Sequence, residues 1–275
     1  MNSEICITIL IDNAATRYEL GSEHGLSLWI EYKGKQILFD TGQSNLLIQN
    51  AEKLGIDLSR TDAIVLSHGH YDHTGGLQSV LELAPRAVIY SHPVAIESRY
   101  SCKGFNVQPI GMPDTAKQAI KNREVVWTEK PVQICNGVGV TGQIPRKNDF
   151  EDVGGAFFTD KKCRKADDFL DDQALFIESP DGVIVVCGCA HSGVVNTLDY
   201  ISELTNQNRI NAIIGGMHLV NADTYRIEKT ISVFKKYDVQ KIAPLHCTGR
   251  EAMEKLKSTF AERCLLLGVG DKICF

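Results

Sequence analysis

The chain has 275 residues, 43% of them hydrophobic and 23% charged, with a formal net charge of −5 and a pI near 5.9. This is the composition of a globular protein, and the acidic balance argues against a nucleic-acid-binding protein that relies on a basic surface. No stretch approaches the roughly 18 consecutive apolar residues of a membrane span, and the N-terminal apolar run lacks the basic segment of a secretory signal, so we expect neither.

The first third of the chain predicts short strands separated by two helices. Apolar runs rich in β-branched and aromatic residues predict strands at 5–11, 26–32, 35–42, 62–67 and 87–93. The residues "YKGK" between the second and third runs are typical of a hairpin turn. Helical spacing of apolar residues predicts helices at 44–56 and 75–84, and Gly55 and Pro85 mark their ends.

The last hundred residues predict a regular alternation of strands and helices. Strands are expected at 173–179 and 183–190, paired as a hairpin, and at 210–217 and 241–246, with terminal strands within 264–275. Helices are expected at 193–205, 222–238 and 249–260. A strand-rich first half followed by alternating elements is consistent with an α/β or α+β protein of two sheets packed face to face, with helices outside.

Residues 93 to about 170 are less regular than the rest. They combine a few strand-like runs with long loops, and irregular insertions of this length tend to carry function. We therefore predict one domain over 1–275, with this insertion covering the functional site. Five aromatic side chains of the insertion are candidates to line a pocket, although such residues are more often part of a core: Phe105, Trp127, Phe150, Phe157 and Phe158.

The cysteines indicate a reducing environment. They stand at 6, 102, 135, 163, 187, 189, 247, 264 and 274, an odd count with irregular spacing in a chain too large to need covalent staples. Reduced thiols in a cytoplasmic protein are the expectation.

The segment "LSHGHYDHTGGL" at 66–77 carries the strongest chemical signal. It places His68, His70, Asp72 and His73 within six residues, at the end of a predicted strand. Neutral imidazole with some carboxylate is the ligand set that zinc favours, and the short spacing can present these residues to two ions that share one hydroxide. The alternative is a strand end with scattered surface histidines. We predict a metal site with these four residues as ligands.

This motif resembles that of the metallo-β-lactamase superfamily, whose members carry it at a strand end. The resemblance implies a four-layer αββα sandwich of two mixed sheets flanked by helices. It also assigns Asp40, in "LFDTG", a supporting role in which it accepts a hydrogen bond from a ligand histidine; the alternative is a turn-forming residue.

Further ligands must come from later in the chain. His191 in "CGCAHSG" and His246 in "PLHCTG" follow apolar strands, and we predict both as metal ligands. His218 in "GGMHL" and His24 in "SEHGLS" are predicted to support the site or to contact substrate. Many superfamily members end a strand in "GD" and bridge two metals with that aspartate. Here the strand ends in "CGCAH", so Cys189 or His191 takes that place, or no residue does.

A narrower resemblance extends from residue 23 to 249. The runs "EHGLSLWIE", "GCAHSGVVN" and "PLHCTG", together with the motifs above, are similar to the dihydropterin-ribofuranosylaminobenzene-phosphate synthase-like branch of the superfamily. That branch implies a small-molecule substrate that is phosphorylated and pterin-like.

We predict a metal-dependent hydrolase that directs metal-activated water to a small anionic ester, lactone or phosphoester, with Asp72 as a metal ligand, as a group that handles a proton, or as both. One alternative is a synthase that joins a pterin-related substrate through a C–N bond, which would make the chain a transferase. Another is a non-catalytic metal- or ligand-binding protein. One or two Zn²⁺ ions are the expected cofactor, and the same ligands also accept iron or manganese. The oligomeric state is not predicted.

Overall fold

The computed structural model describes residues 5–104, 106–121 and 123–275. In these residues the first large sheet has seven strands. In spatial order they are β16 (Lys272–Cys274), β1 (Ile5–Ile11), β2 (Ser27–Tyr32), β3 (Lys35–Phe39), β4 (Ala63–Val65), β5 (Val88–Ser91) and β8 (Val125–Trp127). The pairs from β16 to β3 are antiparallel, and the pairs from β3 to β8 are parallel.

The second large sheet has six strands in the described chain. In spatial order they are β15 (Lys241–Leu245), β14 (Ile210–Gly216), β13 (Gly182–Cys187), β12 (Ala174–Ser179), β10 (Val138–Val140) and β9 (Val132–Cys135). Strands β12 and β13 form the predicted hairpin, whereas β13, β14 and β15 are parallel.

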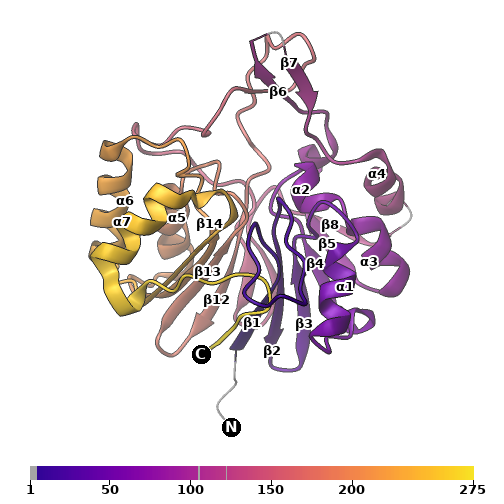
Figure 1. Cartoon of the computed structure of the whole chain (residues 1–275), viewed down its shortest axis with the longest axis horizontal. Helices are drawn as coiled ribbons and strands as arrows, with labels where there is room; N and C mark the ends of the chain where they lie inside the picture. The colour runs from indigo at the N-terminus through magenta and orange to yellow at the C-terminus, as the bar shows by residue number, and fades with distance from the viewer. Residues whose placement is uncertain (1–4, 105, 122) are drawn as a thin grey trace.

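Helices cover the outer faces of both sheets (Figure 1). The first sheet is covered by α1 (Leu46–Lys53), α3 (Leu77–Leu83) and α4 (Asp114–Ile120). The second is covered by α5 (Val194–Thr205), α6 (Thr224–Lys236) and α7 (Arg250–Phe260). The remaining short helices are α2 (Tyr71–Thr74) and the 3₁₀ turns η1 (Leu58–Arg60), η2 (Pro93–Ile96), η3 (His246–Thr248) and η4 (Ala261–Arg263). In the described residues, no helix has the length and apolarity needed to cross a bilayer.

The apolar sequence of β13 shows why the layers form. Ile184 and Val186 pack into the core between the two sheets, whereas Val183 and Val185 pack against the outer helices. Because alternate side chains of a strand point to opposite faces, a continuously apolar strand must be covered on both sides. The predicted αββα sandwich of two mixed sheets is therefore confirmed.

The segment 93–170 is divided among three places. Strand β8 extends the first sheet, and β9 and β10 extend the second. Strands β6 (Tyr100–Lys103), β7 (Asn106–Pro109) and β11 (Phe157–Phe158) form a small third sheet that projects beyond the sandwich (Figure 1). A covering role for this small sheet, and the single domain over 1–275, stay predictions.

One prediction from the sequence, that of reduced cysteines throughout, is wrong. The structure has disulfides between Cys6 and Cys274 and between Cys102 and Cys163, so these four cysteines are not reduced thiols. The first follows from tertiary pairing, because β1 and β16 place Cys6 directly opposite Cys274. Of the terminal strands expected within 264–275, the described chain has β16.

Candidate metal centre

The predicted site residues lie at strand ends that meet at one end of the sandwich. Asp40 follows β3, His68 to His73 follow β4, Cys189 and His191 follow β13, His218 follows β14, and His246 follows β15. Since each sheet has its parallel strands in this region, their carboxyl ends share an edge, which is where open α/β sheets usually bind ligands. Gln173 joins the two edges, because its backbone N–H donates to the Ser67 carbonyl at 2.9 Å.

Three imidazoles, from His68, His70 and His191, converge at this edge; we call them the imidazole triad. Their candidate ligand nitrogens lie within 4.8 Å of one another, and all three side chains are buried. Burial lowers the pKa of each well below the usual value of histidine, so the rings are neutral, the form that binds metals. The Nε2 atom of each ring is buried and lacks a hydrogen-bond partner in the described residues. Buried polar atoms without partners are costly, and a cation bound between them would remove that cost.

A second group surrounds the Asp72 carboxylate; we call it the Asp72 group. Its Oδ2 lies 3.2 Å from His24 Nε2, 3.3 Å from His246 Nε2 and 3.6 Å from His73 Nε2. Although burial opposes it, His73 and the hydrogen bonds from His24 and His246 hold the pKa of Asp72 well below its usual range. Burial likewise opposes a charge on His73, but Asp72 and Asp40 raise its pKa to about 9. The Asp72 group therefore favours a positive charge, from a proton or a metal ion.

In four of the imidazoles, Nδ1 already has a hydrogen-bond partner, and this contact orients Nε2 towards the centre. The contacts are His73 Nδ1 to Asp40 Oδ2 at 2.7 Å, His68 Nδ1 to Ser67 Oγ at 2.9 Å, His191 Nδ1 to the Val153 carbonyl at 2.9 Å, and His246 Nδ1 to Asn13 Oδ1 at 3.0 Å. Asp40 thus makes the kind of contact expected of it. Sequence reasoning missed Asn13, which precedes β2 in a loop without a metal motif.

Cys189 lies between the two groups. Its Sγ is 3.3 Å from His73 Nε2 and shares a candidate ligand cluster with His68 and His73. The chain can come this close because Gly188 has no side chain: a Cβ there would lie 2.0 Å from Ser67 Oγ. Of the two residues considered for the place of a bridging aspartate, Cys189 lies between the groups and His191 belongs to the imidazole triad.

Four turns that carry these residues have non-glycine residues with left-handed backbone. The φ angles are 57° at Asp40, 56° at Ala190, 44° at His218 and 50° at His246. Such conformations cost about 1–3 kcal/mol each and concentrate at functional sites. Their occurrence at four strand ends around one cluster supports a functional role for this edge.

Several neighbours of the cluster were not expected from the sequence. Cys247 lies beside Cys189 and His218, and its one sequence signal is its position directly after His246. Phe169 stacks on His191, with ring centroids 3.8 Å apart.

Of the five aromatic pocket candidates, Phe157 contacts the cluster, with its ring 5.5 Å from that of His70. Trp127 is instead 45% exposed on β8, and Phe150 packs against the core beneath the outer helices of the second sheet. Phe105 lies outside the described residues.

A buried ion-pair network connects the 93–170 segment to the metal-binding loop. Arg99 pairs with Asp167 at 2.5 Å and with Asp171 at 2.6 Å, and the other oxygen of Asp171 accepts the Gly69 N–H at 2.7 Å. Gly69 lies between His68 and His70. Sequence reasoning missed this network because its members are 68 and 72 residues apart.

Replacing Arg99 by methionine should therefore destabilise the protein strongly. Two buried carboxylates would lose their counter-charge, which typically costs about 3–5 kcal/mol and should lower Tm by roughly 6–15 °C. Thermal unfolding followed by circular dichroism measures the change. Arg123→Met is the matched control, since Arg123 donates only to the carbonyl oxygens of Pro85 and Leu81 among the described residues. Equal Tm values for the two variants would contradict the network.

Asp172 should produce a measurable pH dependence of stability. Its Oδ2 accepts the Ser192 N–H at 2.7 Å, its Oδ1 is buried without a partner in the described chain, and burial raises its pKa from 3.8 to about 7. The folded state therefore holds a proton that the unfolded state releases. This stabilisation is complete below pH 4 and is lost as the pH rises to about 7.

Asp172→Asn should remove this loss. Urea denaturation at pH 4 and pH 8 should show the variant gaining stability over the wild type with rising pH, by up to about 4 kcal/mol. Asp168→Asn, on an exposed side chain, is the control. A difference between Asp172→Asn and wild type that stays constant with pH would contradict the assignment.

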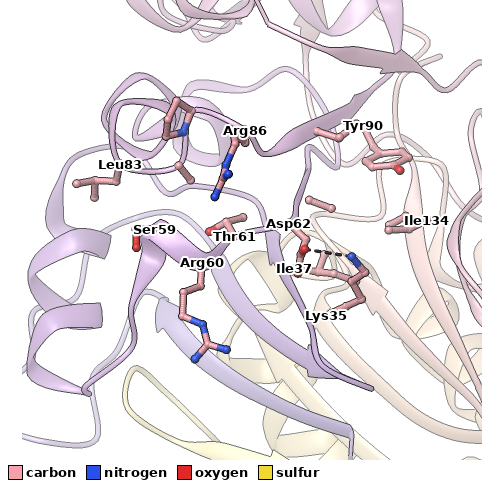
Figure 2. A pocket seen from close by; sticks show the side chains of 14 residues that line it. Lys35, Ile37, Ser59, Arg60, Thr61, Asp62, Leu83, Arg86, Tyr90 and Ile134 are labelled. Carbon is pink, nitrogen blue, oxygen red and sulfur yellow. Dashed lines mark hydrogen bonds and ion pairs between the residues drawn. The ribbon is translucent and has the colours of Figure 1, made fainter.

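A cavity of about 770 Å³ lies at the opposite end of the first sheet (Figure 2). It is lined by residues near the starts of β3, β4 and β5, including Lys35 and Asp62, which form an ion pair at 3.1 Å. None of the predicted site residues lines it, so its size does not make it the candidate centre.

Comparison with known proteins accounts for the strand-end cluster. The model of the metallo-beta-lactamase superfamily matches residues 20–162, about half of the chain. The chain belongs to this superfamily. Its αββα sandwich is the metallo-β-lactamase fold, and the fold implies binding of a divalent metal ion.

Two relatives and one solved structure resemble nearly the whole chain. An uncharacterized protein of Methanocaldococcus jannaschii is 33% identical over 91% of this chain and 93% of its own. From the same organism, 7,8-dihydropterin-6-methyl-4-(beta-D-ribofuranosyl)-aminobenzene-5'-phosphate synthase is 31% identical over 98% and 95%. The crystal structure of a metal-dependent hydrolase of the beta-lactamase superfamily is 29% identical, covers 98% of both chains and has a TM-score of 0.84. The chain thus also matches the synthase-like branch indicated by its motifs.

Proposed function

We propose that this superfamily member is a metal-dependent hydrolase that acts on a small anionic ester, lactone or phosphoester. The observation that carries the proposal is the convergence of three buried, neutral imidazoles whose Nε2 atoms lack partners in the described residues. The Asp72 group lies directly beside them, since the rings of His68 and His73 are 4.3 Å apart. This combination suits two adjacent divalent ions.

The donor set fits zinc. His68, His70 and His191 would hold one ion, and Asp72, His73 and His246 would hold the second, with His24 and Cys189 beside them. Bound ions would supply a nucleophilic hydroxide, by lowering the pKa of water from about 15.7 towards 7, and would stabilise negative charge that develops on the substrate. Nitrogen and carboxylate ligands also accept iron or manganese.

The protein's own groups have separate tasks in this proposal. Asp40 and Asn13 hold the rings of His73 and His246 through Nδ1, which keeps Nε2 directed at the centre. The low pKa of Asp72 keeps its carboxylate ionised, so it can ligate an ion and accept a proton during turnover. The small β6–β7–β11 sheet and Phe157 would contact substrate above the imidazole triad.

A second candidate is a synthase that forms a C–N bond on a phosphorylated, pterin-like substrate. The observation that favours it is the 31% identity, over nearly the whole chain, to the archaeal synthase. In that case the ions would orient the substrate's phosphate, and the stacked rings of Phe169 and His191 would lie close to an aromatic substrate.

Product analysis tests both candidates. The metal content of the purified protein is measured first. The reconstituted protein is then incubated in ¹⁸O-labelled water with ester, lactone and phosphodiester panels and, separately, with a phosphorylated pterin together with an aromatic amine. Label in the product supports hydrolysis, and joined substrates without label support the synthase. Stoichiometric metal without turnover in any panel would instead identify a non-catalytic binding protein and would contradict the proposal.

A further inference from the structure

Three soft or borderline ligands lie at the ends of three adjacent strands, next to the imidazole triad. Cys189 follows β13, His218 follows β14 and Cys247 follows β15, so the parallel strands place them side by side. Their ligand atoms lie within 4.8 Å of one another. The three side chains are only 3%, 8% and 9% exposed. We call these residues the thiolate cluster.

The close approach of the strands around the thiolate cluster depends on a glycine. Gly216, at the end of β14, lies between the two cysteines: a Cβ there would be 2.6 Å from Cys247 Sγ and 3.4 Å from Cys189 Cα. Any side chain at this position would therefore collide with Cys247 Sγ. Glycine lets Cys247 Sγ approach the β13 strand end, where it donates to the Cys189 carbonyl oxygen at 3.6 Å.

Gly154 packs closely against the imidazole ring of His218. Gly154, with φ at +83°, packs on the imidazole so tightly that a Cβ there would lie 1.8 Å from His218 Cδ2. His218 Nδ1 is buried and has no hydrogen-bond partner in the described chain. The ring centroid of His218 lies 4.3 Å from that of His191. His218 is therefore a neighbour of the imidazole triad, although it is not a member of the triad.

We propose that Cys189, His218 and Cys247 form a separate binding site for a thiophilic divalent cation, adjacent to the imidazole triad and the Asp72 group. Two thiolates and one imidazole prefer softer ions than carboxylates do. Three protein ligands leave one position of a tetrahedral zinc-type site for water or another ligand. Cys189 Sγ is also 3.3 Å from His73 Nε2, so its sulfur would face both this cation and the histidine centre.

The two metal-binding proposals can fail independently. The thiolate cluster uses no member of the imidazole triad, and the sulfur ligands have a spectroscopic signature that imidazoles lack. Cobalt(II) is a suitable probe, because thiolate ligation produces a near-ultraviolet charge-transfer band, whereas all-imidazole or imidazole–carboxylate ligation produces none. The readout is therefore independent of any activity.

The experiment titrates Co²⁺ into the full-length protein after metal removal, with the thiols outside the disulfides kept reduced. We expect a charge-transfer band in the wild type that is lost in Cys247→Ser, together with one equivalent of bound metal. Cys264→Ser is the matched control, because Cys264 is equally buried but lies outside the cluster, and this variant should keep the full band. In His70→Ala the band should also persist, even if the imidazole centre is lost.

Other outcomes would overturn the proposal. A band of equal intensity in wild type and Cys247→Ser would mean that Cys189 alone ligates cobalt, as part of the histidine centre. Cobalt binding with no charge-transfer band would exclude thiolate ligation altogether. If Cys247→Ser does not fold, as judged by circular dichroism, His218→Gln tests the same site: Co²⁺ affinity measured from the band should fall by at least roughly tenfold. An unchanged affinity would count against the site.

Discussion

His70→Ala should abolish metal binding at the imidazole triad and reduce hydrolysis by at least about 10³-fold. Each of the three histidines of the triad offers one ligand atom, so the loss of one leaves two ligands. A catalytic metal supplies several kcal/mol of transition-state stabilisation, and each factor of ten in rate corresponds to about 1.4 kcal/mol. Metal content by mass spectrometry and turnover on the substrate found in the panels are the two measurements.

The matched control is His92→Ala. His92 also follows a strand of the first sheet, but its ring accepts the Val94 N–H at the start of η2 and belongs to neither histidine group. This variant should keep its metal and its activity. A His70→Ala protein that is fully active without metal would refute the proposed hydrolase mechanism.

Asp72→Asn should remove one of the two proposed metal ions and leave the other bound. The substitution keeps the shape of the side chain but removes the negative charge that His24, His73 and His246 surround. We expect one equivalent of metal to be lost while the imidazole triad keeps its own. Turnover should fall by about 10²- to 10⁴-fold, because both a ligand and a proton-accepting carboxylate are removed.

Asp62→Asn provides the control at the opposite end of the first sheet, where Asp62 pairs with Lys35. Its metal content and turnover should match those of the wild type. If Asp72→Asn retained both equivalents of metal and full activity, the Asp72 group would have neither of the roles proposed for it.

Local sequence was sufficient to find one half of the candidate centre. His68, His70, Asp72 and His73 lie within six residues, and this spacing after an apolar strand specifies their neighbourhood without knowledge of the rest of the fold. Asp40 was recognised in the same way, from a short motif at a strand end. The contact between Asp40 and His73 could not be derived from spacing alone, since it joins residues 33 positions apart.

The later histidines needed a weaker argument. His191, His218 and His246 each follow an apolar run, and strand ends of parallel sheets share an edge. That reasoning predicted that they would gather, and they do. It could not assign His191 to the imidazole triad and His246 to the Asp72 group, because that division depends on how the two sheets face each other.

The fold class and the nature of the site were therefore determined by the sequence itself, through residue periodicity and one dense metal motif, both of which act over a few residues. Tertiary structure decided the disulfides of Cys6 and Cys102, the Arg99 ion pairs and the position of Cys247 beside Cys189 and His218. These features join residues 29 to 268 positions apart in the chain, so they depend on strand pairing, as between β1 and β16 or among β13, β14 and β15, and on the folding of the 93–170 segment against the metal-binding loop, none of which local sequence specifies.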